Sequence, residues 1–188
     1  MVRPLILALA ALTAGCASTP DEPRPTARIA ADVALTLPLP PGYPDTRSIV
    51  QTGRARYADH QAAFEAVLTL SPERAEIVLI MLGGPRLATI TWDETGIAED
   101  RSVFAPDSVP VENILADIFL SVWPAEAVAE ALPEGVELVV DADIGARTIR
   151  RGEEIIAIIT PDPDDPRRTL IRNEAFGYEV AIVSQSQE

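Results

Sequence analysis

Ile77-Val-Leu-Ile-Met-Leu82 runs directly into Gly83-Gly-Pro85 and then into Arg86-Leu-Ala-Thr-Ile-Thr-Trp92. Two apolar segments separated by a glycine–proline turn predict a pair of antiparallel strands. The first segment is apolar on both of its faces, so we expect a central strand that is covered on both sides.

Further strand signals flank this pair along the chain. Residues 49–57 and 64–70 precede it, and residues 97–104 follow it after a turn at 93–96. Short strands separated by turn signals are typical of an antiparallel meander. A second set of strand signals lies nearer the C-terminus, at residues 136–140, 146–151, 154–160, 169–173 and 178–183.

A helical pattern separates the two predicted meanders. Apolar residues recur at helical spacing in residues 113–123, Trp123-Pro124 ends this helix, and residues 125–132 predict a second, shorter one. The chain therefore predicts an α+β fold, in which two central helices are inserted between two β-meanders. We expect the antiparallel sheet to curve around the helices as a half-open barrel, which would hold an apolar cavity.

The N-terminus has the features of an export signal. Arg3 precedes an uncharged apolar segment at residues 5–14, and small residues lead to Cys16, the single cysteine of the chain. A membrane-spanning helix needs roughly 20 apolar residues, about twice the length of this segment. One interpretation is an ordinary signal peptide followed by an unpaired cysteine, and the other is a lipoprotein signal peptide at residues 1–15.

The residues around the cysteine favour the second interpretation, because Leu12-Thr-Ala-Gly-Cys16 resembles the lipobox of bacterial lipoproteins. The resemblance implies that Cys16 becomes the mature N-terminus and carries acyl chains such as palmitate. More than one acyl chain anchors a protein stably to a membrane that it does not cross. In such lipoproteins a residue other than Asp after the cysteine, here Ala17, implies the periplasmic face of the outer membrane.

Proline density sets the expected domain boundary. Seven prolines lie in residues 16–45, and proline at this density disfavours helix and sheet. We expect residues 16–45 to be a lipidated N-terminus and Pro-rich tether, with residues 33–39 lying along the domain as an edge segment. Residues 46–188 are expected to form a single domain.

The charge of the chain excludes some partners. Its formal net charge is -14, and it contains no lysine. Such a chain is a poor candidate for binding nucleic acid, because neutralised phosphates supply most of that affinity. It is an equally poor candidate for direct adhesion to anionic lipid head groups. A single cysteine allows no disulfide within the chain, and we expect a monomer.

No pattern indicates catalysis or a metal centre. His60 is the only histidine, and no Gly-x-Ser-x-Gly motif accompanies it. Asp162, Asp164 and Asp165 lie among prolines and lack the turn glycine and closing glutamate of a calcium loop. Phosphate-loop and dinucleotide motifs are also missing from the sequence. We therefore expect a protein that is not an enzyme and that uses no cofactor or metal.

Large apolar residues on the predicted strands and helix are candidates for a ligand cavity. Residues of this kind usually belong to the core, and that alternative stays open. The other interpretation is that some of them line a cavity for acyl chains or its helical lid. The candidates are Met81, Trp92, Ile118, Phe119 and Trp123.

Several short motifs, taken in order, resemble a family of small bacterial lipoproteins of unknown function. The motifs are Gln51, Gly84-Pro-Arg-Leu-Ala-Thr-Ile90, Asn113-Ile-Leu-Ala-Asp-Ile-Phe-Leu-Ser-Val-Trp-Pro124, Arg147-Thr-Ile-Arg-Arg-Gly152 and Gly177-Tyr-Glu-Val-Ala-Ile182. These proteins look like distant relatives of the outer-membrane lipoprotein receptor LolB and the carrier LolA. The resemblance covers residues 46–183 and implies a half-open barrel whose interior suits acyl chains. One departure is the Leu82-Gly-Gly-Pro85 turn, which is too tight to form the protruding apolar loop of the receptor.

Two classes of function follow as hypotheses. The first is a lipid-anchored periplasmic binding protein that holds or transfers an acyl-bearing cargo, such as a lipoprotein, a lipid or a lipid-linked molecule. The second is a structural or assembly lipoprotein that docks a protein partner through its sheet or its helical lid. A hydrolase is a third class, for which the sequence offers no motif.

Replacing Cys16 tests the predicted lipid anchor. Cys16→Ala removes the thiol that would carry the acyl chains, so the variant should take up no labelled palmitate and should leave the membrane fraction or stay unprocessed. The checks are palmitate labelling and membrane fractionation beside the wild-type protein. Identical fractionation without labelling of either protein would contradict the lipoprotein interpretation.

Overall fold

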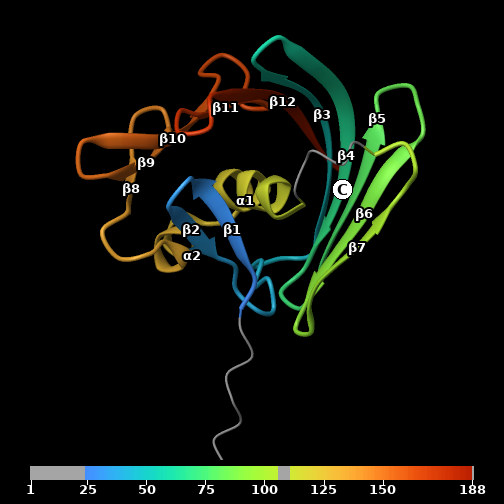
Figure 1. Ribbon diagram of the computed structural model, residues 1–188, viewed down its shortest axis with the longest axis horizontal. Helices are drawn as coiled ribbons and strands as arrows, with labels where there is room; N and C mark the ends of the chain where they lie inside the picture. Colours follow the sequence, from blue (N-terminus) through green and yellow to red (C-terminus); the bar gives the residue numbers. More distant parts are fainter. Residues whose placement is uncertain (1–23, 106–110, 188) are drawn as a thin grey trace, which may run out of the picture.

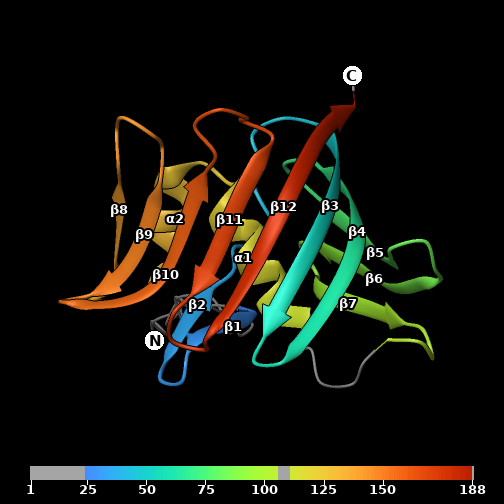
Figure 2. The same cartoon turned by 90° about the horizontal axis from the view of Figure 1, so that it is seen from above.

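Two meanders of antiparallel strands form most of the molecule, of which the computed structural model describes residues 24–105 and 111–187. The first meander comprises β3 (Arg47–Tyr57), β4 (His60–Leu70), β5 (Ala75–Met81), β6 (Arg86–Asp93) and β7 (Gly96–Arg101). The second comprises β8 (Glu137–Val140), β9 (Arg147–Arg151), β10 (Glu154–Pro161), β11 (Arg168–Asn173) and β12 (Tyr178–Gln187). Strand β12 pairs with β3 and joins them into one ten-stranded sheet, in the order β7-β6-β5-β4-β3-β12-β11-β10-β9-β8 (Figures 1 and 2).

Two helices, α1 (Val111–Val122) and α2 (Ala125–Ala131), lie between β7 and β8 in the chain. The sheet curves around α1, and its edge strands β7 and β8 do not pair, so the sheet is not closed (Figure 1). The predicted large antiparallel sheet with two helices inserted between its meanders is confirmed. The fold is mostly β. No helix of the described residues is long and apolar enough to cross a membrane.

The end of α1 is fixed by side chains from distant strands. Arg147 of β9 donates hydrogen bonds from Nη1 to the carbonyl oxygens of Leu120 and Trp123, at 2.7 and 2.8 Å. These carbonyls belong to the last turn of the helix and its end, where a cation also opposes the negative end of the helix dipole. Pro124, with its extended backbone, then starts α2. The second meander thus stabilises the end of α1 at Trp123-Pro124, where the sequence predicts that the helix ends.

The aromatic side chains gather in the core on the concave side of the sheet. Trp92 stacks on Trp123 with ring centroids 5.3 Å apart, and Phe119 and Tyr43 pack against Trp123 at 5.3 and 5.1 Å. The indole N–H of Trp92 donates to the Pro38 carbonyl, and that of Trp123 donates to the Pro41 carbonyl, both at 2.8 Å. The two tryptophans therefore join the sheet, the end of α1 and the Pro-rich segment.

The predicted tether at residues 16–45 contains an element that belongs to the core. Strands β1 (Thr26–Ala30) and β2 (Val33–Thr36) form a separate antiparallel hairpin that packs beside α1 (Figure 1). Its apolar residues alternate along the strands, and burying them outweighs the disfavour of the nearby prolines. The domain thus includes residues before position 46; the buried residues of this segment are Ala27, Ile29, Ala30, Val33, Leu35, Leu37 and Tyr43. The remainder of the predicted tether, residues 16–23, lies outside the described part of the chain.

The expectation that residues 77–82 are covered on both faces is wrong. Ile77 and Leu79 point to the concave side and are buried, whereas Val78 and Ile80 on the convex side are only half-buried. Val78 pairs laterally with Val67 and Thr89, so neighbouring side chains shield it in part. An antiparallel sheet with one face toward solvent needs no second layer, and this shielding accounts for the two-sided apolar sequence.

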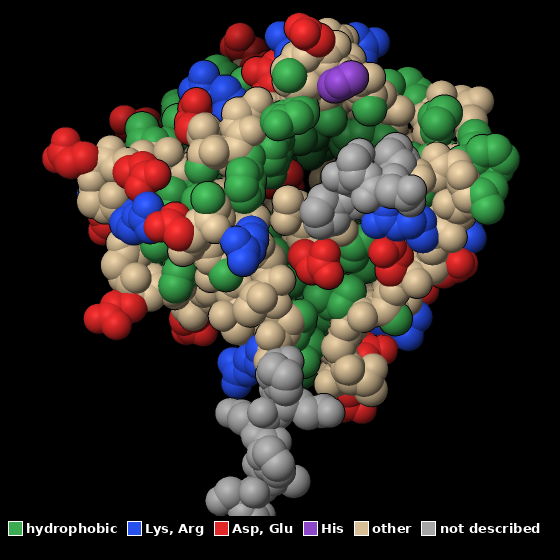
Figure 3. Space-filling model, viewed as in Figure 1, with side chains coloured by type: hydrophobic (Ala, Val, Ile, Leu, Met, Phe, Trp, Pro, Cys, Tyr) green, Lys and Arg blue, Asp and Glu red, His purple; other side chains and the backbone are tan. Residues whose placement is uncertain are grey.

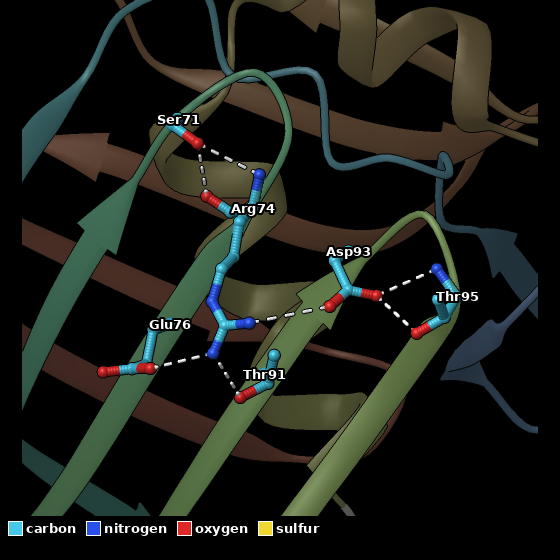
Figure 4. A network of polar contacts seen from close by, with 6 residues as sticks. All are labelled: Ser71, Arg74, Glu76, Thr91, Asp93 and Thr95. Atoms are coloured by element: carbon cyan, nitrogen blue, oxygen red, sulfur yellow. Dashed lines mark hydrogen bonds and ion pairs between the residues drawn. The ribbon is translucent and has the colours of Figure 1, made fainter.

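A surface network fixes two turns at one end of the first meander (Figure 4). Arg74, in the β4–β5 turn, donates to Glu76 at 3.1 Å and reaches Asp93 at 3.7 Å. Asp93 accepts from the backbone and hydroxyl of Thr95, and these hydrogen bonds, chiefly that of the hydroxyl, lower the pKa of Asp93. The network is exposed, so its ion pairs add little to stability.

Charging the two faces of β5 separately tests the one-sided cover. Leu79→Asp would bury an unpaired carboxylate and should lower the free energy of unfolding by about 3 kcal/mol or more. Val78→Asp, one residue away on the convex face, should cost much less because water can reach the carboxylate. Urea unfolding of both variants measures the difference. Equal decreases in the free energy of unfolding of the two variants would contradict the assignment of Leu79 to the buried face and Val78 to the convex face.

Candidate functional site

Helix α1 covers only part of the concave face, and the rest carries apolar side chains in contact with solvent. Side chains alternate along a strand, so Ala55 and Tyr57 of β3 lie on the concave face, as do Ala62 and Phe64 of β4 and Met81 of β5. Tyr57 is 59% exposed and Met81 42% exposed. We call these five residues the concave mouth. Figure 3 shows a hollow lined by hydrophobic side chains between the β3–β4 hairpin and α1.

A glycine keeps one ring of the concave mouth flat against the sheet. Gly53 pairs with Phe64 across β3 and β4, and a Cβ atom at position 53 would lie only 2.3 Å from the ring of Phe64. The ring therefore rests on the backbone of Gly53. A larger residue at position 53 would push this ring toward the hollow, so the glycine helps to keep the hollow open.

One carboxyl group lies between α1 and the sheet, next to a residue that borders the concave mouth. Asp117 of α1 accepts a hydrogen bond from the Tyr178 hydroxyl, which is 2.8 Å from Oδ1 and 2.9 Å from Oδ2. Tyr178 is the first residue of β12 and pairs with Tyr57 of the concave mouth. Both Asp117 and Tyr178 are partly buried. The pair thus connects the helix to the sheet at the border of the concave mouth.

The turn before Tyr178 is held by a buried amide. Asn173 donates from Nδ2 to the Ile29 carbonyl of β1 at 3.0 Å, and its Oδ1 accepts from the Phe176 backbone at 2.8 Å. These bonds fix the β11–β12 turn against the β1–β2 hairpin. Tyr178 therefore approaches Asp117 from a rigid position.

Burial has the largest effect on the pKa values of Asp117 and Tyr178. Desolvation raises the pKa of Asp117 from 3.8 to about 7, although the hydrogen bond from Tyr178 acts in the opposite direction. Burial, followed by the charge of Asp117, raises the pKa of Tyr178. No arginine or histidine of the described residues pairs with Asp117. An acidic group with a strongly shifted pKa beside a hollow is a functional-site candidate.

The residues predicted to line a cavity fall into two groups in the structure. Trp92, Phe119 and Trp123 are fully buried and pack against one another, with Trp92 and Phe119 6.0 Å apart. Ile118 is 7% exposed and belongs to the same core. Met81 lies in the concave mouth, away from this core cluster. Cys16 lies outside the described residues.

The acidic clusters of the sequence form turns. Asp165 pairs with Arg167 and Arg168, and Asp162 accepts hydrogen bonds from the backbone of Asp164 and Asp165. No cluster of the described residues could hold a metal ion. Asp117 was not among the sequence candidates, although it stands out as an acid between apolar neighbours on an amphipathic helix.

Comparison with protein families supplies a match over most of the chain. Residues 48–186 match the model of a family described as protein of unknown function (DUF3261). The chain belongs to the DUF3261 family. The region that DUF3261 matches begins in β3 and ends in β12, so it contains the concave mouth, Asp117 and Tyr178, while the β1–β2 hairpin precedes it. No match to a curated protein was found.

The Asp117–Tyr178 pair predicts a pH dependence of stability. The native state keeps the proton of Asp117 up to about pH 7, whereas the unfolded chain releases it near its ordinary pKa of 3.8. The stabilising effect of protonation is therefore complete below about pH 4 and is lost as the pH rises to about 7, with a slope of up to about 1.4 kcal/mol per pH unit.

Asp117→Asn isolates this effect, because the amide oxygen can still accept from Tyr178 and carries no charge. Urea unfolding at several pH values should show the variant gaining stability relative to the wild type between about pH 4 and pH 7. A stability difference that does not change over this range would contradict the raised pKa.

Proposed function

We propose that this chain is a lipid-anchored periplasmic binding protein that holds or transfers an acyl-bearing cargo at the outer membrane, without catalysing a reaction. The observation that carries the proposal is the concave mouth, an apolar part of the sheet that α1 leaves open. Apolar surface of this kind is usually covered by a partner or a ligand. A cargo with an acyl chain would provide that cover.

Apolar burial supplies the driving force for such binding. Removing apolar surface from water contributes about 25 cal/mol per Å², and a flexible chain can follow a curved surface. Phe64 and Met81 are register partners on β4 and β5, and their side chains would form the floor beneath the chain. The resemblance to LolA and LolB, whose interiors suit acyl chains, supports the same class of cargo.

The predicted anchor would keep the mouth near a membrane. Arg24, the first described residue, follows Cys16 by eight positions. Eight residues span at most about 29 Å when fully extended. An acylated Cys16 would thus hold the domain within reach of lipids or lipoproteins in the same membrane.

The chemistry of Asp117 and Tyr178 supports binding rather than catalysis. Among the described residues, no serine, cysteine or histidine forms a hydrogen bond with either side chain. A nucleophile and a base within hydrogen-bond reach are the usual signature of covalent catalysis.

A second candidate function, docking of a protein partner, is favoured by a different apolar patch. Ser102 donates from its backbone to the Leu87 carbonyl and from its hydroxyl to the Arg86 carbonyl, which places the end of β7 beside the β5–β6 hairpin. The exposed Val103 and Phe104 follow Ser102, and the exposed Leu82 lies in the hairpin turn. A partner that covers this corner would make the protein an assembly lipoprotein.

Binding of Nile red, an uncharged dye that fluoresces in apolar surroundings, tests the proposed function. The wild-type mature chain should enhance the fluorescence of the dye. Any lipid that is extracted from the purified protein should displace the dye when it is added back. Ala62→Glu places a charge in the concave mouth and should weaken dye binding by about tenfold or more, because the carboxylate must lose its water.

The control is Ala63→Glu, which adds the same charge at the next position on the convex face. This variant should bind the dye like the wild type. Equal binding by both variants, or no dye uptake by the wild type, would favour the docking function instead.

A further inference from the structure

The Asp117 carboxylate retains unused capacity for hydrogen bonds. An ionised carboxylate offers about four acceptor positions, and here a single donor, the Tyr178 hydroxyl, approaches both oxygens. Asp117 is partly accessible, so another donor can reach it. A desolvated carboxyl group with a single hydrogen-bond donor is costly to retain for structure alone.

Two arginines on the concave side are engaged elsewhere, and His60, which lies opposite Tyr57 at the rim of the concave mouth, forms no ion pair with Asp117 among the described residues. Arg147 binds the carbonyls at the end of α1, and Arg151 pairs with Asp32 and Glu154 at 2.7 Å each. A head group with a negative charge would therefore meet Asp117 without a described cation to offset it. A positively charged head group would supply the charge that the site lacks, and the net charge of -14 adds long-range attraction.

The geometry allows one ligand to contact the acid and the apolar surface together. Tyr178 begins β12, and β3, β4 and β5 follow it in order across the sheet. From β12 to β5 there are three strand spacings, about 14 Å in all. A molecule whose head group lies at Asp117 can thus extend its chain across Phe64 toward Met81.

From this juxtaposition we infer that Asp117 and Tyr178 form a head-group subsite that selects amphiphiles with a primary ammonium group. Tyr178 orients the carboxylate, and Asp117 accepts hydrogen bonds from the ammonium. The inference rests on the proposed function, because the subsite needs the concave mouth to receive the chain. The pKa of Asp117, about 7, keeps a substantial ionised fraction at neutral pH, and an adjacent ammonium would increase it.

Displacement of Nile red by decylamine, decanol and decanoate tests the subsite, because these compounds share one chain length and differ in the head group. At neutral pH the wild-type mature chain should bind decylamine about tenfold more tightly than decanol, and decanoate most weakly. Asp117→Asn should remove the preference for the amine, so that the variant binds decylamine no more tightly than decanol. Tyr178→Phe, which frees the carboxylate from its orienting hydroxyl, should reduce the preference in part.

The matched control is Glu112→Gln, which removes one negative charge from an exposed position on the same helix. This variant should keep the preference for decylamine, and a loss there would show that only the overall charge matters. If all three compounds bind equally to the wild type, or if Asp117→Asn keeps the amine preference in a folded protein, the subsite is wrong while the binding function stands. If none of the compounds displaces the dye and the dye itself does not bind, the proposed function fails.

Discussion

The stacked pair of Trp92 and Trp123 is the interaction on which the remaining structure depends. Trp92 is the next-to-last residue of β6, Trp123 directly follows α1, and their rings lie 5.3 Å apart. Each indole also donates to a carbonyl of the Pro-rich segment, at Pro38 or Pro41. Buried indoles need such partners, and proline carbonyls are available because this segment forms no sheet. One contact thus orders three parts of the chain that are distant in sequence.

Fixing α1 at this place also creates the hollow. Strands β3 and β4 each contain 11 residues, which corresponds to about 36 Å, whereas a helix with its side chains is only about 10 Å wide. A single helix cannot cover strands of this length, and the β1–β2 hairpin packs on the side of α1 that faces away from the β3–β4 hairpin (Figure 1). The apolar residues beyond the helix therefore stay open near the β3–β4 hairpin. Gly53 preserves this space by letting the Phe64 ring lie flat.

The sequence predicts those parts of the fold that depend on local periodicity. The alternation in β3, β4 and β6 and the helical spacing of Leu115 and Phe119 were sufficient for the two meanders and the inserted helices. The β1–β2 hairpin was missed because its stability comes from burial against α1, while proline density is a purely local signal. The two-sided apolar pattern of β5 suggested that a second layer of structure covers its convex face. Val78 is instead shielded by side chains of the neighbouring strands, and the sequence of one strand does not show which side chains lie beside it. Trp92 and Trp123 could not be assigned to core or cavity, since an unfilled volume has no sequence pattern.

Asp117 is a charged residue at a position of α1 where the fold favours an apolar one. An apolar residue at this position of α1 would pack against the sheet without the desolvation that raises the pKa of the acid to about 7. Native structures keep residues that do not suit their local environment mainly at functional sites. Favourable interactions elsewhere in the fold offset the stability that such residues lose. Here the aromatic core and the Arg147 contacts fix α1 at its end, one turn and a half beyond Asp117. This rigid support lets the helix carry a poorly compensated acid at the border of an open apolar surface, which is the arrangement that a head-group site requires.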